Sequence, residues 1–177
     1  LGAWLEEQGF ASEDSLLLRR TVDAGGRSRA WINGSNATVA QLKTLADSLA
    51  EGFAEALHEV VRREYWGYAP DEKLSNEELF AGHFRGIRPA PGYPSSPDHT
   101  EKKQIFQILD ASRNAGMSLT ETMMMTPAAS VCGHYFSCPQ ALYFPLGRIQ
   151  DDQLEDYAKR KAWTKEEAYK WLAPLLG

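Results

Sequence analysis

The sequence predicts an α+β fold in which an antiparallel sheet is flanked by helices and an N-terminal β-hairpin leads into a long helix. Apolar residues recur at three- and four-residue spacing between positions 42 and 60, which places them on one face of a helix. Short runs of strand-forming residues, separated by turn residues, occur near the N-terminus and again between positions 117 and 149. Their close spacing indicates antiparallel pairing.

The β-hairpin is the first element along the chain. Two runs of strand-forming residues, Leu16–Val22 and Arg29–Asn33, are separated by the turn-rich segment Asp23–Ser28. The pair Asn33-Gly34 has turn chemistry and is expected to end the second strand.

The long helix is expected to begin after Thr38. Thr38 and Gln41 have the spacing of a capping box, in which each side chain bonds the backbone of the other residue. The helix would extend over residues 39–63, about 37 Å at 1.5 Å per residue. Aromatic residues, a glycine and a proline between 65 and 70 then stop it.

The centre of the chain is predicted to be a rigid loop between two helices. Ser75–Glu78 has the pattern of a second capping box, and Gly82 is expected to end the short helix that follows. Residues 85–97 contain four prolines and two glycines, a density that neither a helix nor a central strand tolerates. A further helix is expected from Asp98 to about Asn114.

The C-terminal part is predicted to hold an antiparallel meander followed by two helices. Its three expected strands are 117–125, 129–137 and 142–149. The first helix is expected from Asp151 or Asp152 to about Lys161, and the last is expected between Thr164, which caps it, and Pro174.

Composition argues against several classes of protein. The chain has 177 residues and a net charge of −5, whereas a nucleic-acid binder normally presents a basic face, so no nucleic acid is expected. No apolar run approaches the roughly 20 residues that span a bilayer, so no membrane is expected. The segment from Leu1 meets acidic residues at once and lacks a basic region, so it is not expected to be a signal peptide. The missing initiator Met indicates a fragment, and a cytoplasmic location is expected. Cys132 and Cys138 lack zinc-site spacing, and no metal is expected.

The segment Arg85–Pro94, RGIRPAPGYP, resembles the signature loop of cobalamin-dependent methionine synthases. Runs on both sides resemble the same family, in family order and at family spacing. They are Tyr65–Glu72, Leu74–Leu79, Pro97–Lys102, Gly116–Glu121, Ala129–Val131, Tyr135–Ser137, Asp152–Ala158 and Trp171–Pro174. On this resemblance, residues 46–177 are the C-terminal part of the S-adenosylmethionine-binding activation domain.

The resemblance implies a substrate-binding module of a methyltransferase. In that family the domain binds S-adenosylmethionine and presents its methyl group to cobalamin in the inert cob(II) state. With one electron from a flavodoxin-type donor, methylcobalamin is restored. Cobalamin is bound by a domain that is absent from this chain, and that domain is therefore an expected partner. No catalytic residue is expected here, and no turnover by the chain alone.

The signature loop supplies four of the ligand-binding residues that the resemblance implies. Arg88 is expected to bind the ligand carboxylate, because a guanidinium can donate two parallel hydrogen bonds to it. Ala90 would offer backbone groups to adenine, and Gly92 would let the backbone approach the ligand closely. Tyr93 would add an aromatic face or a hydroxyl. Alternatively, Arg88 is a solvated loop arginine and the segment is a structural proline-rich linker.

Three further residues are assigned through the resemblance. Tyr143 and Phe144 match an aromatic pair near the ligand, where aromatic faces attract the sulfonium cation. Glu51 aligns with a glutamate that contacts the ligand. Alternatively, Tyr143 and Phe144 lie in the core of the sheet, and Glu51 is an exposed carboxylate on the helix. The chain departs from the family at Gly82, where relatives carry a glutamate, and a charged contact with the ligand should therefore be missing.

Residues 1–45 resemble a different family. The runs LLLRR from Leu16 and GRSRAWING from Gly26, followed by Gln41, resemble the head domain of RecN-type DNA-repair ATPases. The phosphate-binding loop and the Walker B acid are missing, so no nucleotide chemistry is implied. The chain is interpreted as a chimera joined within the long helix. The alternative functions are an interaction fragment of a DNA-repair ATPase and a chimera without function.

Overall fold

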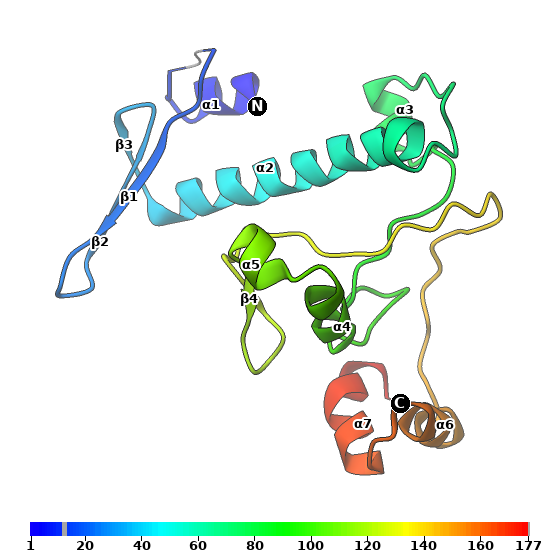
Figure 1. Ribbon diagram of the computed structural model, residues 1–177. Coiled ribbons are helices and arrows are strands. Elements are labelled where there is room, and N and C mark those ends of the chain that lie inside the picture. Colours follow the sequence, from blue (N-terminus) through cyan, green and yellow to red (C-terminus); the bar gives the residue numbers. More distant parts are fainter. Residues whose placement is uncertain (12–13, 177) are drawn as a thin grey trace. The chain divides into compact units, whose positions relative to one another are not determined.

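The computed structural model describes residues 1–11 and 14–176. The chain forms two compact units, Leu1–Gly52 and Phe53–Gly177. Both units combine helices with short antiparallel strands, so the predicted α+β class is confirmed. The long helix α2 (Val39–Val60) carries the chain from the first unit into the second (Figure 1).

The N-terminal unit contains a three-stranded antiparallel sheet in the order β1-β2-β3. Its strands are β1 (Leu18–Val22), β2 (Ser28–Ile32) and β3 (Ser35–Ala37). The first two form the predicted hairpin. The expectation that Asn33-Gly34 ends the second strand is confirmed, and these residues, at φ 46° and 80°, turn the chain into the additional strand β3.

The core of this unit combines side chains from several elements, among them helix α1 (Gly2–Glu7), the sheet and α2. Its buried residues are Leu5, Phe10, Ile32 and Leu45. The capping box predicted at the start of α2 is confirmed. The Gln41 N–H donates to Thr38 Oγ1 at 3.1 Å, and the Thr38 N–H donates to Gln41 Oε1 at 2.9 Å.

Helix α2 continues in the C-terminal unit as a π-helical segment, η1 (Val61–Tyr65). After a loop, α3 (Asn76–Phe80) begins with the predicted capping box of Ser75 and Glu78. Gly82 follows at φ 74°, in the left-handed region that favours glycine. Its predicted place just beyond the end of this helix is therefore confirmed.

The helix predicted after the proline-rich loop is interrupted. It forms α4 (Glu101–Ile108) and α5 (Ala111–Ala115), with Asp110 between them at φ 44°. A left-handed residue cannot continue a right-handed helix, so the prediction of one uninterrupted helix is wrong here. Gly116, at φ 63°, ends α5.

The sheet of the C-terminal unit is smaller than the predicted meander. Its two strands are β4 (Ser118–Leu119) and β5 (Met125–Thr126), paired antiparallel. The strands expected at 129–137 and 142–149 are wrong, because each of these segments contributes one residue to an isolated β-bridge.

The bridge between Phe136 and Ile87 indicates why no longer strand forms. These two residues exchange both backbone hydrogen bonds, at 2.9 and 3.0 Å, and the His134 N–H donates to the Pro89 carbonyl at 3.0 Å. Pro89 has no N–H with which to continue the ladder. The segment around residue 135 is therefore held against the proline-rich loop rather than in a sheet.

The C-terminal end forms a helix pair, α6 (Asp151–Lys161) and α7 (Lys165–Leu172), followed by the short 3-10 helix η2 (Ala173–Leu175). The predicted cap of α7 is present, since Thr164 Oγ1 accepts a hydrogen bond from the Glu167 N–H. The pair has its own buried core of Leu154, Ala158, Ala168 and Leu172.

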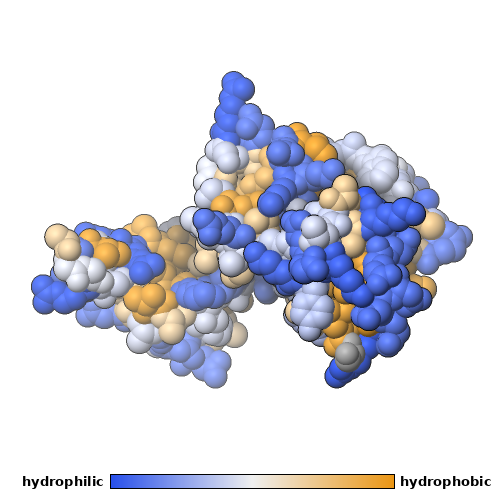
Figure 2. Space-filling model, turned by 90° about the horizontal axis from the view of Figure 1, so that it is seen from below, coloured by the Kyte–Doolittle hydropathy of each residue, from blue (hydrophilic) through white to orange (hydrophobic). Residues whose placement is uncertain are grey.

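Hydrophobic side chains also lie at the surface. On the face shown in Figure 2 they are interspersed with hydrophilic ones. Within residues 1–11 and 14–176, no helix is both long and apolar enough to cross a membrane.

Candidate ligand-binding site

The proline-rich loop is fixed by backbone hydrogen bonds of its own. The Gly92 N–H donates to the Ser96 carbonyl at 2.7 Å, and the Ser96 N–H donates to the Tyr93 carbonyl at 2.8 Å. The loop also packs closely on the segment after residue 132, since a Cβ on Gly86 would meet the Phe136 carbonyl oxygen at 2.0 Å. The loop therefore has one defined shape, as its proline content predicts.

Gly92 permits a close approach that the sequence does not predict. It lies at φ 101°, and a Cβ there would meet the imidazole of His99 at 2.1 Å. The buried Lys102 holds this imidazole, with its Nζ 3.0 Å from His99 Nδ1 and 3.1 Å from the Met123 carbonyl oxygen. Burial, together with the charge of Lys102, lowers the pKa of His99, which favours the neutral ring beside the ammonium group.

Arg88 is held at both its main chain and its side chain. Its backbone N–H donates to the hydroxyl of Tyr143 at 2.8 Å. Its guanidinium forms an ion pair with Glu55 of α2 and lies 5.5 Å from the centre of the Phe84 ring. Burial alone would lower the pKa of Arg88, but the hydrogen bond and charge of Glu55 raise it above the ordinary value.

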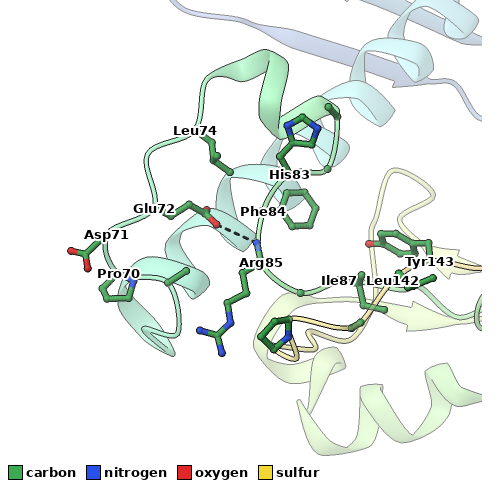
Figure 3. A pocket seen from close by; sticks show the side chains of 16 residues that line it. Pro70, Asp71, Glu72, Leu74, His83, Phe84, Arg85, Ile87, Leu142 and Tyr143 are labelled. Carbon is green, nitrogen blue, oxygen red and sulfur yellow. Dashed lines mark hydrogen bonds between the residues drawn. The ribbon is translucent and has the colours of Figure 1, made fainter.

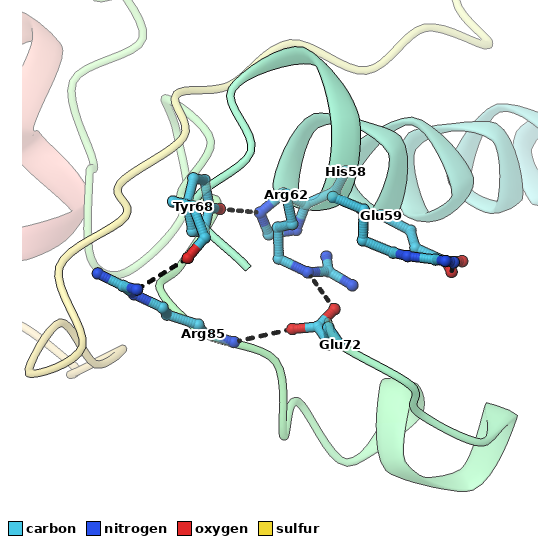
Figure 4. Close-up of polar contacts among 7 residues, drawn as sticks. His58, Glu59, Arg62, Tyr68, Glu72 and Arg85 are labelled. Atoms are coloured by element: carbon cyan, nitrogen blue, oxygen red, sulfur yellow. Dashed lines mark hydrogen bonds and ion pairs between the residues drawn. The ribbon is translucent and has the colours of Figure 1, made fainter. Parts of the chain in front are cut away.

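A buried cluster of aromatic and charged side chains lies beside Arg88. His58, with no exposed surface, stacks on Tyr135 at 4.7 Å between ring centres and meets Phe84 edge-on at 5.0 Å. Its Nε2 lies 3.1 Å from the Tyr68 hydroxyl (Figure 4). Burial, together with the charges of Arg62 and Arg88, lowers the pKa of His58 to about 4. The ring is therefore neutral at pH 7.

Two further arginines tie this cluster to the loop. Arg62 is fully buried and donates to Glu72 at 2.7 Å. Arg85 donates from its side chain to the Tyr68 carbonyl at 2.8 Å and to the Ser137 carbonyl at 3.1 Å. Its backbone N–H reaches Glu72 at 3.4 Å (Figure 4). Segment η1, the proline-rich loop and the segment around residue 137 are thereby connected.

The C-terminal unit contains a pocket of about 690 Å³ (Figure 3). Phe84 and Tyr143, which both contact Arg88, line it. Acidic, basic and apolar side chains also line it, among them Asp71, Glu72, Leu74, His83, Arg85, Ile87 and Leu142. Gly82 lies in the same wall, and a Cβ there would have no heavy atom within 4 Å. Such a cavity is large enough for a small organic ligand.

Comparison with known proteins assigns the chain to a family. Residues 35–162 match the family described as vitamin B12-dependent methionine synthase, activation domain. This span is more than half of the chain. The chain belongs to this family. The resemblance found through the signature loop is thereby confirmed at the level of the family.

A solved structure supports the same assignment. The crystal structure of the MetH reactivation domain bound to AdoHcy is similar to this activation domain, with 57% identity and a TM-score of 0.75. The match covers 77% of this chain and 42% of that one, so the present chain spans less than half of its length. Neither match supports the RecN-type resemblance of residues 1–45, and the family match already begins at residue 35.

The activation domain brings some of the predicted site residues together. Arg88 contacts Tyr143, whereas Phe144 lines a second pocket of about 490 Å³ beside Pro89 and His134. Tyr93 is 65% exposed on the loop. Ala90 is partly buried there. Their ligand roles, with that of Gly92, stay predictions.

Glu51 lies in the N-terminal unit, exposed on α2, and its role stays a prediction too. Sequence reasoning missed Glu55, which lies one helical turn further on and pairs with Arg88. A spacing of four residues places both glutamates on one helix face. That spacing was a signal that the helix could offer a second carboxylate.

Proposed function

We propose that this activation domain binds S-adenosylmethionine and supplies its methyl group for the reductive remethylation of cob(II)alamin. Membership of the methionine synthase activation family carries the proposal. The similar MetH structure is bound to AdoHcy, which differs from S-adenosylmethionine by the loss of that methyl group. Both ligands share the adenosine and the amino-acid head that the site must recognise.

The residues of this chain fit such a ligand. Arg88 Nη1 is buried and has no hydrogen-bond partner among the described residues, and a ligand carboxylate is a suitable acceptor for it. Tyr143 and Phe144 are about half exposed, at 50% and 51%, so their ring faces are available to a sulfonium cation. Ala90, Gly92, Tyr93 and Glu51 are proposed to complete the site, as the family resemblance implies.

The remaining partners are proposed on family grounds. Cobalamin would be held by the cobalamin-binding domain of the parent enzyme, and the electron would come from a flavodoxin-type donor. We propose a cytoplasmic location and no turnover by the chain alone. Residues 1–45 are proposed to be a separate RecN-like fragment and residues 46–177 the methionine synthase part.

Calorimetric titration of the chain tests this function directly. S-adenosylmethionine and S-adenosylhomocysteine should both bind with one site per chain. Adenosine should bind more weakly, because it lacks the amino-acid head that Arg88 recognises. If the chain unfolds cooperatively but binds neither S-adenosylmethionine nor S-adenosylhomocysteine, the function is ruled out for this chain.

A further inference from the structure

The space beside Gly92, where another residue would carry its Cβ, is filled by a side chain of the same unit. A Cβ at Gly92 would overlap three atoms of the His99 imidazole, Cε1, Nδ1 and Nε2. The Gly92 N–H is also in use, because it donates to the Ser96 carbonyl at 2.7 Å. Glycine is needed at this position to admit the His99 ring against the backbone of the proline-rich loop.

The main chain of His99 is anchored on both sides by buried residues. Its neighbours Asp98 and Thr100 are 3% and 7% exposed. The Asp98 carboxylate accepts hydrogen bonds from the Thr100 N–H at 2.7 Å and from the Thr100 hydroxyl at 2.9 Å. It also accepts one from the Tyr157 hydroxyl at 2.7 Å and pairs with Lys161 at 2.9 Å. The His99 ring therefore extends from a fixed piece of backbone.

Lys102 fixes the orientation of this ring. Lys102 is only 6% exposed, and its Nζ lies 3.0 Å from His99 Nδ1 and 3.1 Å from the Met123 carbonyl oxygen. An ammonium group has donors and no acceptor, so His99 Nδ1 must accept and the proton of the neutral ring must lie on Nε2. Burying an ammonium group is costly unless its donors are satisfied, which strengthens the preference for this arrangement.

We infer that Lys102 and His99 are positioning residues for the proline-rich loop. Lys102 holds His99 in the tautomer that is protonated at Nε2, and the ring supports the loop at Gly92. Neither side chain needs to touch a ligand. A loop that is held in place beforehand does not have to be ordered when the ligand binds, which improves affinity. The effect on binding rests on the proposed function, whereas the tautomer and the loop position exist without any ligand.

Nitrogen NMR of the histidine rings tests the tautomer in the unaltered chain, because protonated and unprotonated ring nitrogens have well-separated shifts. At pH 7, His99 should carry its proton on Nε2. Its titration should lie below the ordinary pKa of about 6.5, since burial and the charge of Lys102 lower the pKa of His99 although the charge of Asp98 raises it. The nearby Cys132 thiol stays neutral, because burial raises its pKa. A proton on Nδ1 at pH 7 would overturn the inference without any variant.

The variant Lys102→Met keeps a long side chain and removes its donors. The pKa of His99 should then rise toward its ordinary value, and the Gly92 N–H should exchange faster with deuterium because the ring no longer holds one orientation. Affinity for S-adenosylhomocysteine should fall about three- to tenfold, as expected for one hydrogen bond. Lys103→Met is the matched control, because Lys103 is the next residue of α4 and is exposed. It should change none of the three measurements.

Several outcomes with folded Lys102→Met would contradict the inference. An unchanged pKa of His99 would show that Lys102 does not hold the ring. Either an unchanged exchange of the Gly92 N–H or an unchanged ligand affinity would show that the ring does not position the loop. Failure of the proposed function gives a different result, in which the unaltered chain binds no S-adenosylhomocysteine while the tautomer of His99 and the exchange at Gly92 still respond as expected.

Discussion

The main-chain N–H of Arg88 donates a hydrogen bond of 2.8 Å to the hydroxyl of Tyr143, 55 residues further along the chain. Neither residue lies in a helix or a strand. The bond joins the proline-rich loop to a residue that lines the pocket, while Glu55 of α2 pairs with the other end of the same arginine. Arg88 is thus fixed by contacts from two distant parts of the C-terminal unit.

Arg88→Ala should abolish most of the ligand binding. Loss of a charge-assisted hydrogen bond costs about 1.5–3 kcal/mol, which is roughly a ten- to hundredfold fall in affinity for S-adenosylmethionine. Titration calorimetry measures it, with Arg63→Ala as the control because Arg63 forms an exposed ion pair with Glu59. Equal affinity of Arg88→Ala and the unaltered chain would remove Arg88 from the site.

Gly82→Glu should strengthen ligand binding. Gly82 lines the pocket and has open space around a Cβ, so the new carboxylate can reach a ligand cation and contribute about 1–3 kcal/mol. The left-handed backbone, at φ 74°, opposes it with a stability cost of about 1 kcal/mol. Gly82→Ala isolates that cost, since it carries the same strain without the charge. A Glu variant that binds no better than the Ala variant would argue against a ligand cation near this wall.

Gly92→Ala should destabilise the C-terminal unit by about 2 kcal/mol or more, because the methyl group meets the His99 ring and the residue lies at φ 101°. Urea unfolding measures the free energy. Gly52→Ala is the control: Gly52 lies in α2 with open space around it, so the change should stabilise by about 0.5–1 kcal/mol. Combining Gly92→Ala with His99→Ala should recover part of the loss. No recovery would mean that backbone strain alone sets the cost.

The stability of the protein should fall as the pH is lowered from 7 to 5. The pKa of His58 is lowered to about 4 in the folded state, against about 6.5 in an unfolded chain. As the pH falls, the unfolded state therefore takes up a proton before the folded state does. This lowers the free energy of unfolding by about 2 kcal/mol at pH 5. Urea unfolding at both pH values measures this change. In His58→Gln the fall should be smaller by about that amount, and an equal fall would exclude His58 as its source.

Removal of residues 1–34 should leave the unfolding of the C-terminal unit nearly unchanged. The family match begins at residue 35, and the removed segment supplies the core of a separate unit through Leu5, Phe10 and Ile32. Differential scanning calorimetry should show the main transition at the same temperature within a few degrees. A fall of many degrees would show that this segment stabilises the rest of the chain.

Local sequence patterns predicted where two of the helices, α2 and α3, begin. The capping boxes at Thr38 and Ser75 both form as expected, because a cap involves residues three positions apart. The strands predicted at 129–137 and 142–149 do not form, although their composition favours them. Strand formation depends on a partner, and the partner of Phe136 is a loop in which Pro89 ends the pairing.

The sequence by itself determined the family, through the loop that contains Arg88, and it determined the helices that begin at their own caps. Only the tertiary structure revealed that Glu55 pairs with Arg88, that His99 occupies the space beside Gly92, and that Phe84 and Tyr143 line one pocket. The physical reason is the range of each interaction. Caps and turns depend on neighbours a few residues away, whereas the site is assembled by an ion pair and a hydrogen bond across separations of 33 and 55 residues.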